Sequence, residues 1–250
     1  MRSIEGMVAW ITGAGTGIGA GAARALAAEG VIVALTGRRA APLEQVAERV
    51  RADGGTAEVA TGDATDREAM RAMARGIAER HGRLDLLLNN HGINVTDRYW
   101  KGGALDGWDQ VIDVNVKGAY NCAEAALRVM APRGEGTIIT TSSKAGINYS
   151  LRAGVAYGAS KHAVMALSQM INDEYGNQGI RACALCPGEV ETPILDLRPV
   201  QVPAEDRARL IQAEDMGDIV VFMLKLPARV ILNEVIISPT HRRTPQPGEV

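Results

Sequence analysis

Tyr157 and Lys161 are the residues whose types and spacing most directly suggest chemistry. Residues four apart on a helix share a face, so the ammonium of Lys161 can lie near the phenol of Tyr157. A tyrosine with an ordinary pKa of about 10 is a poor acid or base at neutral pH. A cation about 4 Å away contributes roughly 4 kcal/mol at an effective dielectric of ~20, before desolvation opposes it. The pair therefore predicts a phenol tuned for proton transfer, although the same spacing is common on helix surfaces that do no chemistry.

Polar residues follow two of the short apolar runs. Ser142 and Ser143 come after the run 137–141, and the segment Asn-Asn-His-Gly at 89–92 ends the run 84–88. Open parallel sheets present their chemistry at the carboxyl ends of the strands. We therefore expect these side chains to meet Tyr157 at one edge of a sheet.

A glycine-rich turn follows the first apolar run, at residues 12–19. Glycine lets the backbone approach a phosphate closely, and a helix N-terminus supplies free N–H groups and partial positive charge. The spacing is Gly13-x-x-x-Gly17-x-Gly19, with Thr16 and Ile18 between, and differs from the common G-x-G-x-x-G. The turn predicts a pyrophosphate site; the alternative is a turn that only serves close helix–strand packing.

The residues after the second apolar run bear on the choice of cofactor. An NAD-binding fold often places a carboxylate there for the ribose 2′-hydroxyl, whereas this chain has Arg38 and Arg39. Two guanidiniums can hold a 2′-phosphate. The interpretation favours NADP(H). The alternatives are that NAD(H) binds with an arginine stacked on its adenine, or that the arginines only begin a solvated helix.

The elements that must position these residues alternate along the chain. Short apolar runs typical of strands buried on both faces lie at 8–11, 31–35, 57–60, 84–88, 137–141, 180–186 and 235–237. Helical patterns lie at 17–29, 41–52, 66–81, about 105–131 and 155–175. This alternation predicts an α/β fold with a parallel, doubly wound sheet of about seven strands and helices on both faces. No linker divides the chain, so residues 1–250 are expected to form one domain.

Composition narrows the function further. The formal charge is −2, which argues against a nucleic-acid surface or a polybasic membrane anchor, and no run approaches the ~18 apolar residues of a membrane span. Three cysteines make no disulfide framework, and Cys183 and Cys186 form no zinc set. We expect a reduced, cytoplasmic protein. The prolines in 192–205 predict a loop that lines the substrate pocket, and those in 241–250 a mobile tail.

Taken together and in order, these motifs resemble the short-chain dehydrogenase/reductase family over essentially the whole chain. The motifs that carry the resemblance are 12–19, 89–92, Asn115 within 113–118, Ser143 followed by Gly146, Tyr157-x-x-x-Lys161, and 187–192. The resemblance implies a Rossmann-type domain with a catalytic tetrad of Asn115, Ser143, Tyr157 and Lys161. Ser142 is the alternative to Ser143.

The resemblance also implies a role for each of the four. Tyr157 donates a proton to a carbonyl oxygen, and Ser143 forms a hydrogen bond to that oxygen. Lys161 lowers the phenol pKa and holds the cofactor ribose, and Asn115 holds a water. The resemblance further implies a homotetramer or homodimer with the long helices at an interface. The cofactor contacts, from the residues and the resemblance together, are Gly13, Thr16, Gly17, Ile18, Gly19, Arg38, Arg39, Asp63, Ala64, Asn90, Tyr157, Lys161, Pro187, Gly188, Val190 and Thr192.

The expected activity is hydride transfer between a nicotinamide dinucleotide and a small carbonyl or secondary alcohol. One alternative is a non-catalytic dinucleotide-sensing regulator; another is a lyase related to halohydrin dehalogenases, which lose the glycine turn. His91 stands where the family usually has alanine, and either fills space beside the ribose or contacts a polar substrate. Residues 230–240 resemble the branch that contains NADP-dependent hydroxy-acid dehydrogenases, which does not fix the substrate.

Overall fold

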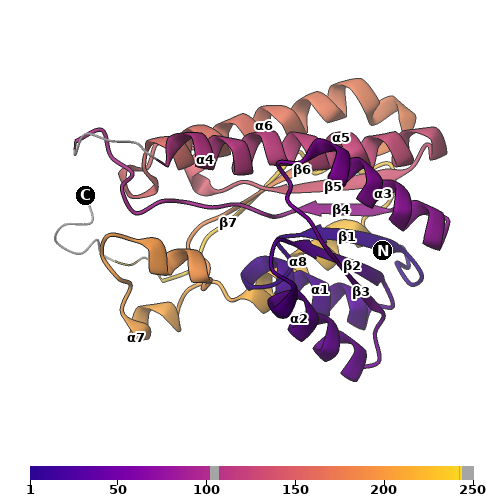
Figure 1. Cartoon of the computed structure of the whole chain (residues 1–250), viewed down its shortest axis with the longest axis horizontal. Helices are drawn as coiled ribbons and strands as arrows, with labels where there is room; N and C mark the ends of the chain where they lie inside the picture. The colour runs from indigo at the N-terminus through magenta and orange to yellow at the C-terminus, as the bar shows by residue number, and fades with distance from the viewer. Residues whose placement is uncertain (102–106, 242, 244–250) are drawn as a thin grey trace.

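The computed structural model of the protein describes residues 1–101, 107–241 and 243. Its centre is a parallel seven-stranded sheet in the order β3-β2-β1-β4-β5-β6-β7 (Figure 1). The strands are β1 (Val8–Thr12), β2 (Ile32–Gly37), β3 (Ala57–Thr61), β4 (Leu86–Asn89), β5 (Gly136–Thr141), β6 (Ile180–Pro187) and β7 (Glu234–Ile237). The strand order reverses between β1 and β4, which creates a crevice at their carboxyl ends. All seven predicted strands are confirmed.

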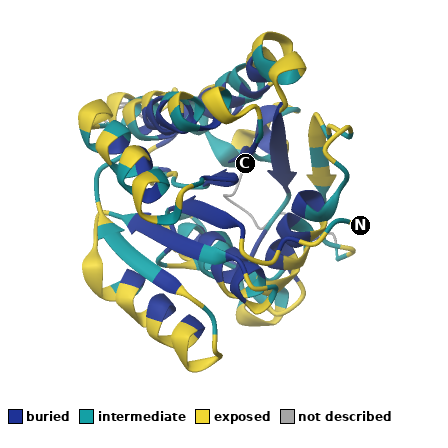
Figure 2. Cartoon of the chain, turned by 90° about the vertical axis from the view of Figure 1, so that its right-hand side faces the viewer, coloured by how far each residue is buried: buried dark blue, intermediate teal, exposed yellow. Residues whose placement is uncertain are grey.

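Helices cover both faces of the sheet (Figure 1). One hydrophobic cluster packs α1 (Gly17–Ala28), α2 (Ala40–Ala52) and α8 (Ala213–Lys225) on one face. A second cluster packs α3 (Arg67–His81), α5 (Gly118–Met130) and α6 (Val155–Tyr175) on the other. The inner strands β1, β4, β5 and β6 are buried along their whole length, whereas β7 at the edge is half exposed (Figure 2). This burial on both faces explains the continuous apolar runs of the sequence.

The helix expected from about residue 105 to 131 is observed from Trp108 onward. It comprises α4 (Trp108–Ile112), a π-helical turn at Asp113–Lys117 and α5, followed by a 3-10 turn at Ala131–Arg133. Its expected start lies outside the described residues. The π-helical turn, in which the backbone bonds reach one residue further than in an α-helix, contains the buried Asn115.

Two of the described helices, α8 and the four-residue α7 (Ala204–Arg207), were not predicted. Helix α8 begins at a capping box formed by Gln212 and Asp215 and packs on α1 through Gly21 and Gly217. A Cβ on Gly217 would stand 2.7 Å from the carbonyl oxygen of Gly21, so the two backbones meet where neither helix has a side chain. The segment 192–205 also holds more regular structure than expected: a 3-10 helix at Pro193–Leu197 and the start of α7. Most of the predicted mobile tail, residues 242 and 244–250, lies outside the described residues.

Candidate active site

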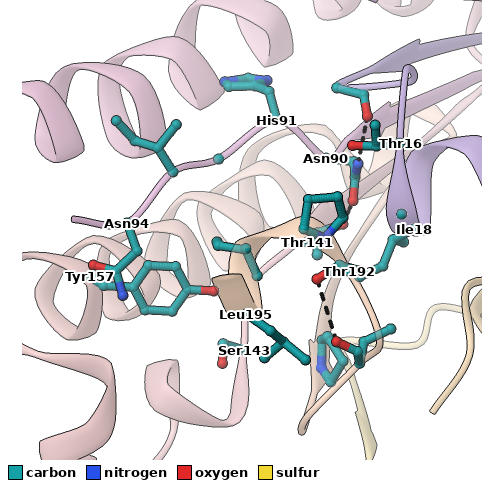
Figure 3. A pocket seen from close by; sticks show the side chains of 18 of the residues that line it. Thr16, Ile18, Asn90, His91, Asn94, Thr141, Ser143, Tyr157, Thr192 and Leu195 are labelled. Atoms are coloured by element: carbon teal, nitrogen blue, oxygen red, sulfur yellow. Dashed lines mark hydrogen bonds between the residues drawn. The ribbon is translucent and has the colours of Figure 1, made fainter. Parts of the chain in front are cut away.

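A cavity of about 1000 Å³ opens at the carboxyl edge of the sheet. Its walls come from the glycine turn after β1, the ends of β2, β4, β5 and β6, and the first turn of α6. This is the crevice at the point where the strand order reverses, which is where open α/β sheets bind ligands. Figure 3 shows its lining, with Tyr157 on one side and the glycine turn of Thr16 and Ile18 on the other.

The glycine turn is held in a shape that only glycine allows. Gly13 and Gly17 have φ values of 62° and 52°, in the left-handed region that side chains disfavour. A Cβ on Gly17 would stand 2.7 Å from Cγ2 of Thr192, and one on Gly13 2.8 Å from Cα of His91. Helix α1 begins just after this turn, and its N-cap Thr16 makes no side-chain capping bond. The first N–H groups of α1 thus remain available to an anion.

Gly19 supports this turn without lining the cavity. A Cβ on Gly19 would collide with the carbonyl oxygen of Gly13 and stand 2.8 Å from Nδ2 of Asn90. The Asn90 amide in turn donates to the Gly13 carbonyl (3.3 Å), and its oxygen accepts from the Thr141 hydroxyl (3.1 Å). These contacts join the ends of β1, β4 and β5 and the start of α1 at the cavity.

The end of the cavity beside β2 and β3 carries Arg38, Arg39 and Asp63. Both arginines are exposed. Asp63 accepts hydrogen bonds from the backbone N–H and the hydroxyl of Thr65, both at 2.9 Å. The backbone bond from Thr65 is the strongest of the effects that lower the pKa of Asp63, and Arg38 adds to it. This end can thus hold a phosphate against two guanidiniums and a sugar or base edge against a carboxylate.

Tyr157 and Ser143 meet in the middle of the cavity. Tyr157 lies in the first turn of α6, and Ser143 follows the end of β5. Both side chains line the cavity, and Ser143 is the neighbour that most lowers the pKa of Tyr157. In Figure 3 the Tyr157 hydroxyl points into the pocket toward the side where Ser143 and Leu195 lie. The Ser142 hydroxyl instead donates to the backbone carbonyl of Lys161 (2.9 Å). The structure therefore brings Ser143, and not Ser142, to the phenol.

Lys161 lies one helical turn beyond Tyr157, with Nζ 5.3 Å from the centre of the phenol ring. Nζ donates to the carbonyl of Thr141 (2.7 Å), and burial lowers the pKa of this ammonium to about 8. Lys161 is not among the groups that shift the phenol pKa here, so its lowering of that pKa stays a prediction. Burial raises the pKa of Tyr157, and the groups that oppose the rise are Ser143, Arg198 and Arg98. The physical reason is that desolvation of the phenolate outweighs the attraction of nearby cations.

Asn115 stands behind Lys161 and does not line the cavity. Its amide nitrogen donates to the Ile93 carbonyl (2.9 Å) and to the Ser160 hydroxyl (3.0 Å), and its oxygen accepts from the Ile93 N–H (2.8 Å). These bonds fix the loop after β4 against α6. Because the side chain is engaged in this way, it holds position rather than reaching the cavity.

His91 is neutral and turned into the protein. Nδ1 lies 2.8 Å from the Thr12 hydroxyl and Nε2 lies 3.1 Å from the Val114 carbonyl. A carbonyl only accepts, so Nε2 carries the proton and Nδ1 accepts from Thr12. Burial, with the charge of Lys161 second, lowers the pKa of His91 to about 4. Both ring nitrogens are satisfied by the protein, which favours the space-filling interpretation over contact with substrate.

Apart from Gly19, every residue predicted to contact the cofactor lines the cavity. Those that line the cavity are Gly13, Thr16, Gly17, Ile18, Arg38, Arg39, Asp63, Ala64, Asn90, Tyr157, Lys161, Pro187, Gly188, Val190 and Thr192. Thr192, next to the glycine turn, donates to the Val190 carbonyl (3.4 Å). Cys183 and Cys186 are buried free thiols, and the described part of the chain holds no cluster of three side chains that could bind a metal.

Sequence reasoning missed the residues at the far end of the cavity. Arg98, Arg152, Glu189, Arg198 and Arg243 line this end. They come from four separate loops, so no spacing in the sequence links them. The one available signal was the expectation that residues 192–205 line the substrate pocket.

Comparison with known proteins agrees with this geometry. Residues 7–200 match the family model described as short chain dehydrogenase. The chain is 32% identical over 241 residues to an uncharacterized oxidoreductase of Staphylococcus saprophyticus, covering 96% of this chain and all of that protein. It is 34% identical over 241 residues to a glycine betaine reductase of Emericella nidulans, of whose length it spans only 19% while 94% of this chain is covered.

A solved structure gives the same architecture with a nucleotide bound. The crystal structure of a metagenomic short-chain oxidoreductase in complex with NADP superposes with a TM-score of 0.82 at 31% identity, covering 96% of this chain and all of that one. No described helix is long and apolar enough to cross a membrane.

Proposed function

The chain belongs to the short-chain dehydrogenase/reductase family, and from that premise we propose how its residues divide the work of cofactor binding and proton transfer. The protein is an oxidoreductase that transfers a hydride between a nicotinamide dinucleotide and a carbonyl or secondary alcohol. No comparison supports the regulator considered as the alternative. The observation that carries the proposal is that Tyr157 and Ser143 line the same cavity as the glycine turn, with the Tyr157 hydroxyl pointing into it (Figure 3).

The cavity fits a dinucleotide on its own geometry. The glycines leave room for a phosphate at the free N–H groups of α1, because side chains at positions 13 and 17 would collide with His91 and Thr192. Asp63 and Asn90 would hold the ribose and adenine half, and Thr192 the carboxamide end. When bound, the dinucleotide supplies or accepts the hydride.

Tyr157 donates a proton to the substrate oxygen in the reducing direction. Burial raises its pKa, so the phenol stays protonated at neutral pH and is competent as an acid. Ser143 donates a hydrogen bond to the same oxygen as charge develops on it. Lys161 holds the ribose and contributes positive charge under the phenol ring, and Asn115 positions the loop after β4 behind it.

The preferred cofactor is NADP(H), with NAD(H) as the alternative. Arg38 and Arg39 stand exposed at the end of β2, where they can pair with a 2′-phosphate, and the solved relative is an NADP complex. Charge-assisted hydrogen bonds contribute about 1.5–3 kcal/mol, which corresponds to roughly 10- to 100-fold in affinity.

Steady-state kinetics with both cofactors tests this preference. We expect R38Q/R39Q to lower the NADPH:NADH ratio of kcat/KM by roughly 10- to 100-fold. Arg75, exposed on α3 and outside the cavity, offers the matched control R75Q, whose ratio should equal that of the wild type. Equal KM values for NADH and NADPH in the wild-type enzyme would refute the preference.

A homotetramer or homodimer is the proposed assembly, in a cytoplasmic setting. Large apolar side chains stay exposed on the outer faces of the helices and on the edge strand, where a second copy could cover them: Tyr120 on α5, Met170 on α6, Phe222 on α8 and Ile236 on β7. Light scattering after size-exclusion chromatography tests this, and a monomer at micromolar concentration would contradict it.

A further inference from the structure

The far end of the cavity, beyond Tyr157, has a surplus of positive charge. Four arginines, Arg98, Arg152, Arg198 and Arg243, line it together with one carboxylate, Glu189. Arg98 and Arg198 act on the pKa of Tyr157, whereas Arg38 acts on that of Asp63, so the two groups of arginines lie in different parts of the cavity. A bound dinucleotide placed at the glycine turn therefore leaves these charges facing the space where a substrate must sit.

Three of the arginines share the single carboxylate. One oxygen of Glu189 lies 2.5 Å from Nη1 of Arg198, 3.2 Å from Nη2 of Arg243 and 3.6 Å from Nη1 of Arg152. Arg198 lowers the pKa of Glu189 most among its partners, against the effect of burial. One carboxylate neutralises one guanidinium, so Arg152 and Arg198 alone already exceed the negative charge that the described residues of the cluster supply.

Arg98 has no carboxylate within salt-bridge distance among the described residues. It is 3% exposed, and its terminal nitrogens donate to two neutral carbonyls, those of Arg152 (3.1 Å) and Leu197 (2.5 Å). Its Nε has no hydrogen-bond partner among the described residues. A buried charge without a counter-ion is costly, and the cost is offset if an anion enters the cavity that this arginine lines.

The cluster lies close to the reacting group. The charges of Arg198 and Arg98 both act to lower the pKa of Tyr157, so both guanidiniums stand within electrostatic range of the phenol. An anionic group held there would lie in the same cavity as the Tyr157 hydroxyl.

We propose that the arginine cluster at 98, 152 and 198 binds an anionic group of the substrate, a carboxylate or a phosphate ester, close to the carbonyl that is reduced. The inference rests on the proposed function and names the substrate class of the same site. Bidentate pairing with planar guanidiniums gives this group both attraction and orientation. The competing explanation is that the arginines only tie the loops at 150–154 and 189–198 together.

Matched substrates distinguish the two explanations. The full-length enzyme would be assayed at 340 nm with a short 3-oxo carboxylate and its methyl ester, and with a ketone phosphate ester and the same ketone without phosphate. We expect kcat/KM to favour at least one anion over its neutral partner by about 10- to 100-fold. The pair that shows the preference identifies carboxylate or phosphate as the recognised group.

Variants then connect the preference to the cluster. R198M and R152M should each reduce the anion-to-neutral ratio of kcat/KM by about 10-fold or more. Arg209 is exposed and outside the cavity, so R209M removes the same charge nearby and should leave the ratio at its wild-type value. Two variants are used because one alone could loosen the loops; a folded variant is verified by its melting temperature.

Two results would overturn the inference alone. One is equal kcat/KM for charged and neutral partners in both pairs; the other is a preference for the anion that R198M and R152M leave intact. Failure of the proposed function gives a different result, namely no Tyr157-dependent hydride transfer to any carbonyl, charged or neutral, with either cofactor.

Discussion

Acidification should destabilise the protein through His91. In the folded chain burial lowers the pKa of this imidazole to about 4 from its ordinary value of 6.5. Folding therefore favours the neutral ring, and the stabilisation is complete above the unfolded pKa and lost as pH falls through 6.5 toward 4. Burial of the charged ring is the main cost, and the bond to Val114 acts against it. Protonation at Nδ1 also removes the acceptor that Thr12 donates to.

The size of the effect follows from linkage. The pKa of His91 falls from 6.5 in the unfolded chain to about 4 in the folded one. Between about pH 7.5 and about pH 5 this difference lowers the free energy of unfolding by about 2 kcal/mol. The carboxylates whose pKa values are lowered, such as Glu189 and Asp63, lose their own contributions at still lower pH. They are present in every variant and cancel in a comparison.

Urea unfolding of the wild type and of H91A at the two pH values isolates this contribution. At a fixed protein concentration, the wild type should lose about 2 kcal/mol more than H91A on acidification. H91A itself will be less stable at pH 7.5, because it leaves a cavity beside Gly118. Equal losses for the two proteins would refute the assignment of a neutral, internally bonded His91.

Three further changes test the site. Y157F should abolish turnover, measured as the change in cofactor absorbance at 340 nm, because the proton donor is gone. Cofactor affinity measured by fluorescence titration should stay within about 3-fold of the wild-type value. Retained turnover would contradict the role of the phenol. G17A should weaken cofactor binding and lower the free energy of unfolding by about 1–3 kcal/mol. The reason is that Gly17 has a φ of 52° and that a Cβ there would stand 2.7 Å from Cγ2 of Thr192. An unchanged KM for the cofactor and an unchanged melting temperature would contradict the role of the turn as a phosphate site. G118A should lower the free energy of unfolding by about 1–3 kcal/mol, because the new Cβ would stand 2.6 Å from Nε2 of His91. Adding H91A should recover most of this loss. Additive losses in a double-mutant cycle would show that the two positions do not compete for space.

Most of the architecture was readable from local pattern. The apolar runs of β1, β4, β5 and β6 have no polar alternation because both faces of the sheet are covered. The pattern of α6 fixed its bounds, and the four-residue spacing placed Tyr157 and Lys161 on one face. Helix α8 was not predicted from the sequence pattern, because its apolar residues lie close together. The helix depends on packing against α1 at Gly21 and Gly217.

The division between sequence and tertiary structure at the site has a physical basis. Motifs within a few residues, such as the glycine turn and the Tyr157–Lys161 pair, follow from backbone geometry and are visible in the sequence alone. Only the folded chain decided that Ser143 rather than Ser142 meets Tyr157, that burial raises the phenol pKa, and that three arginines from different loops share Glu189. Hydration and charge depend on which groups come together from distant parts of the chain, and no local spacing carries that information.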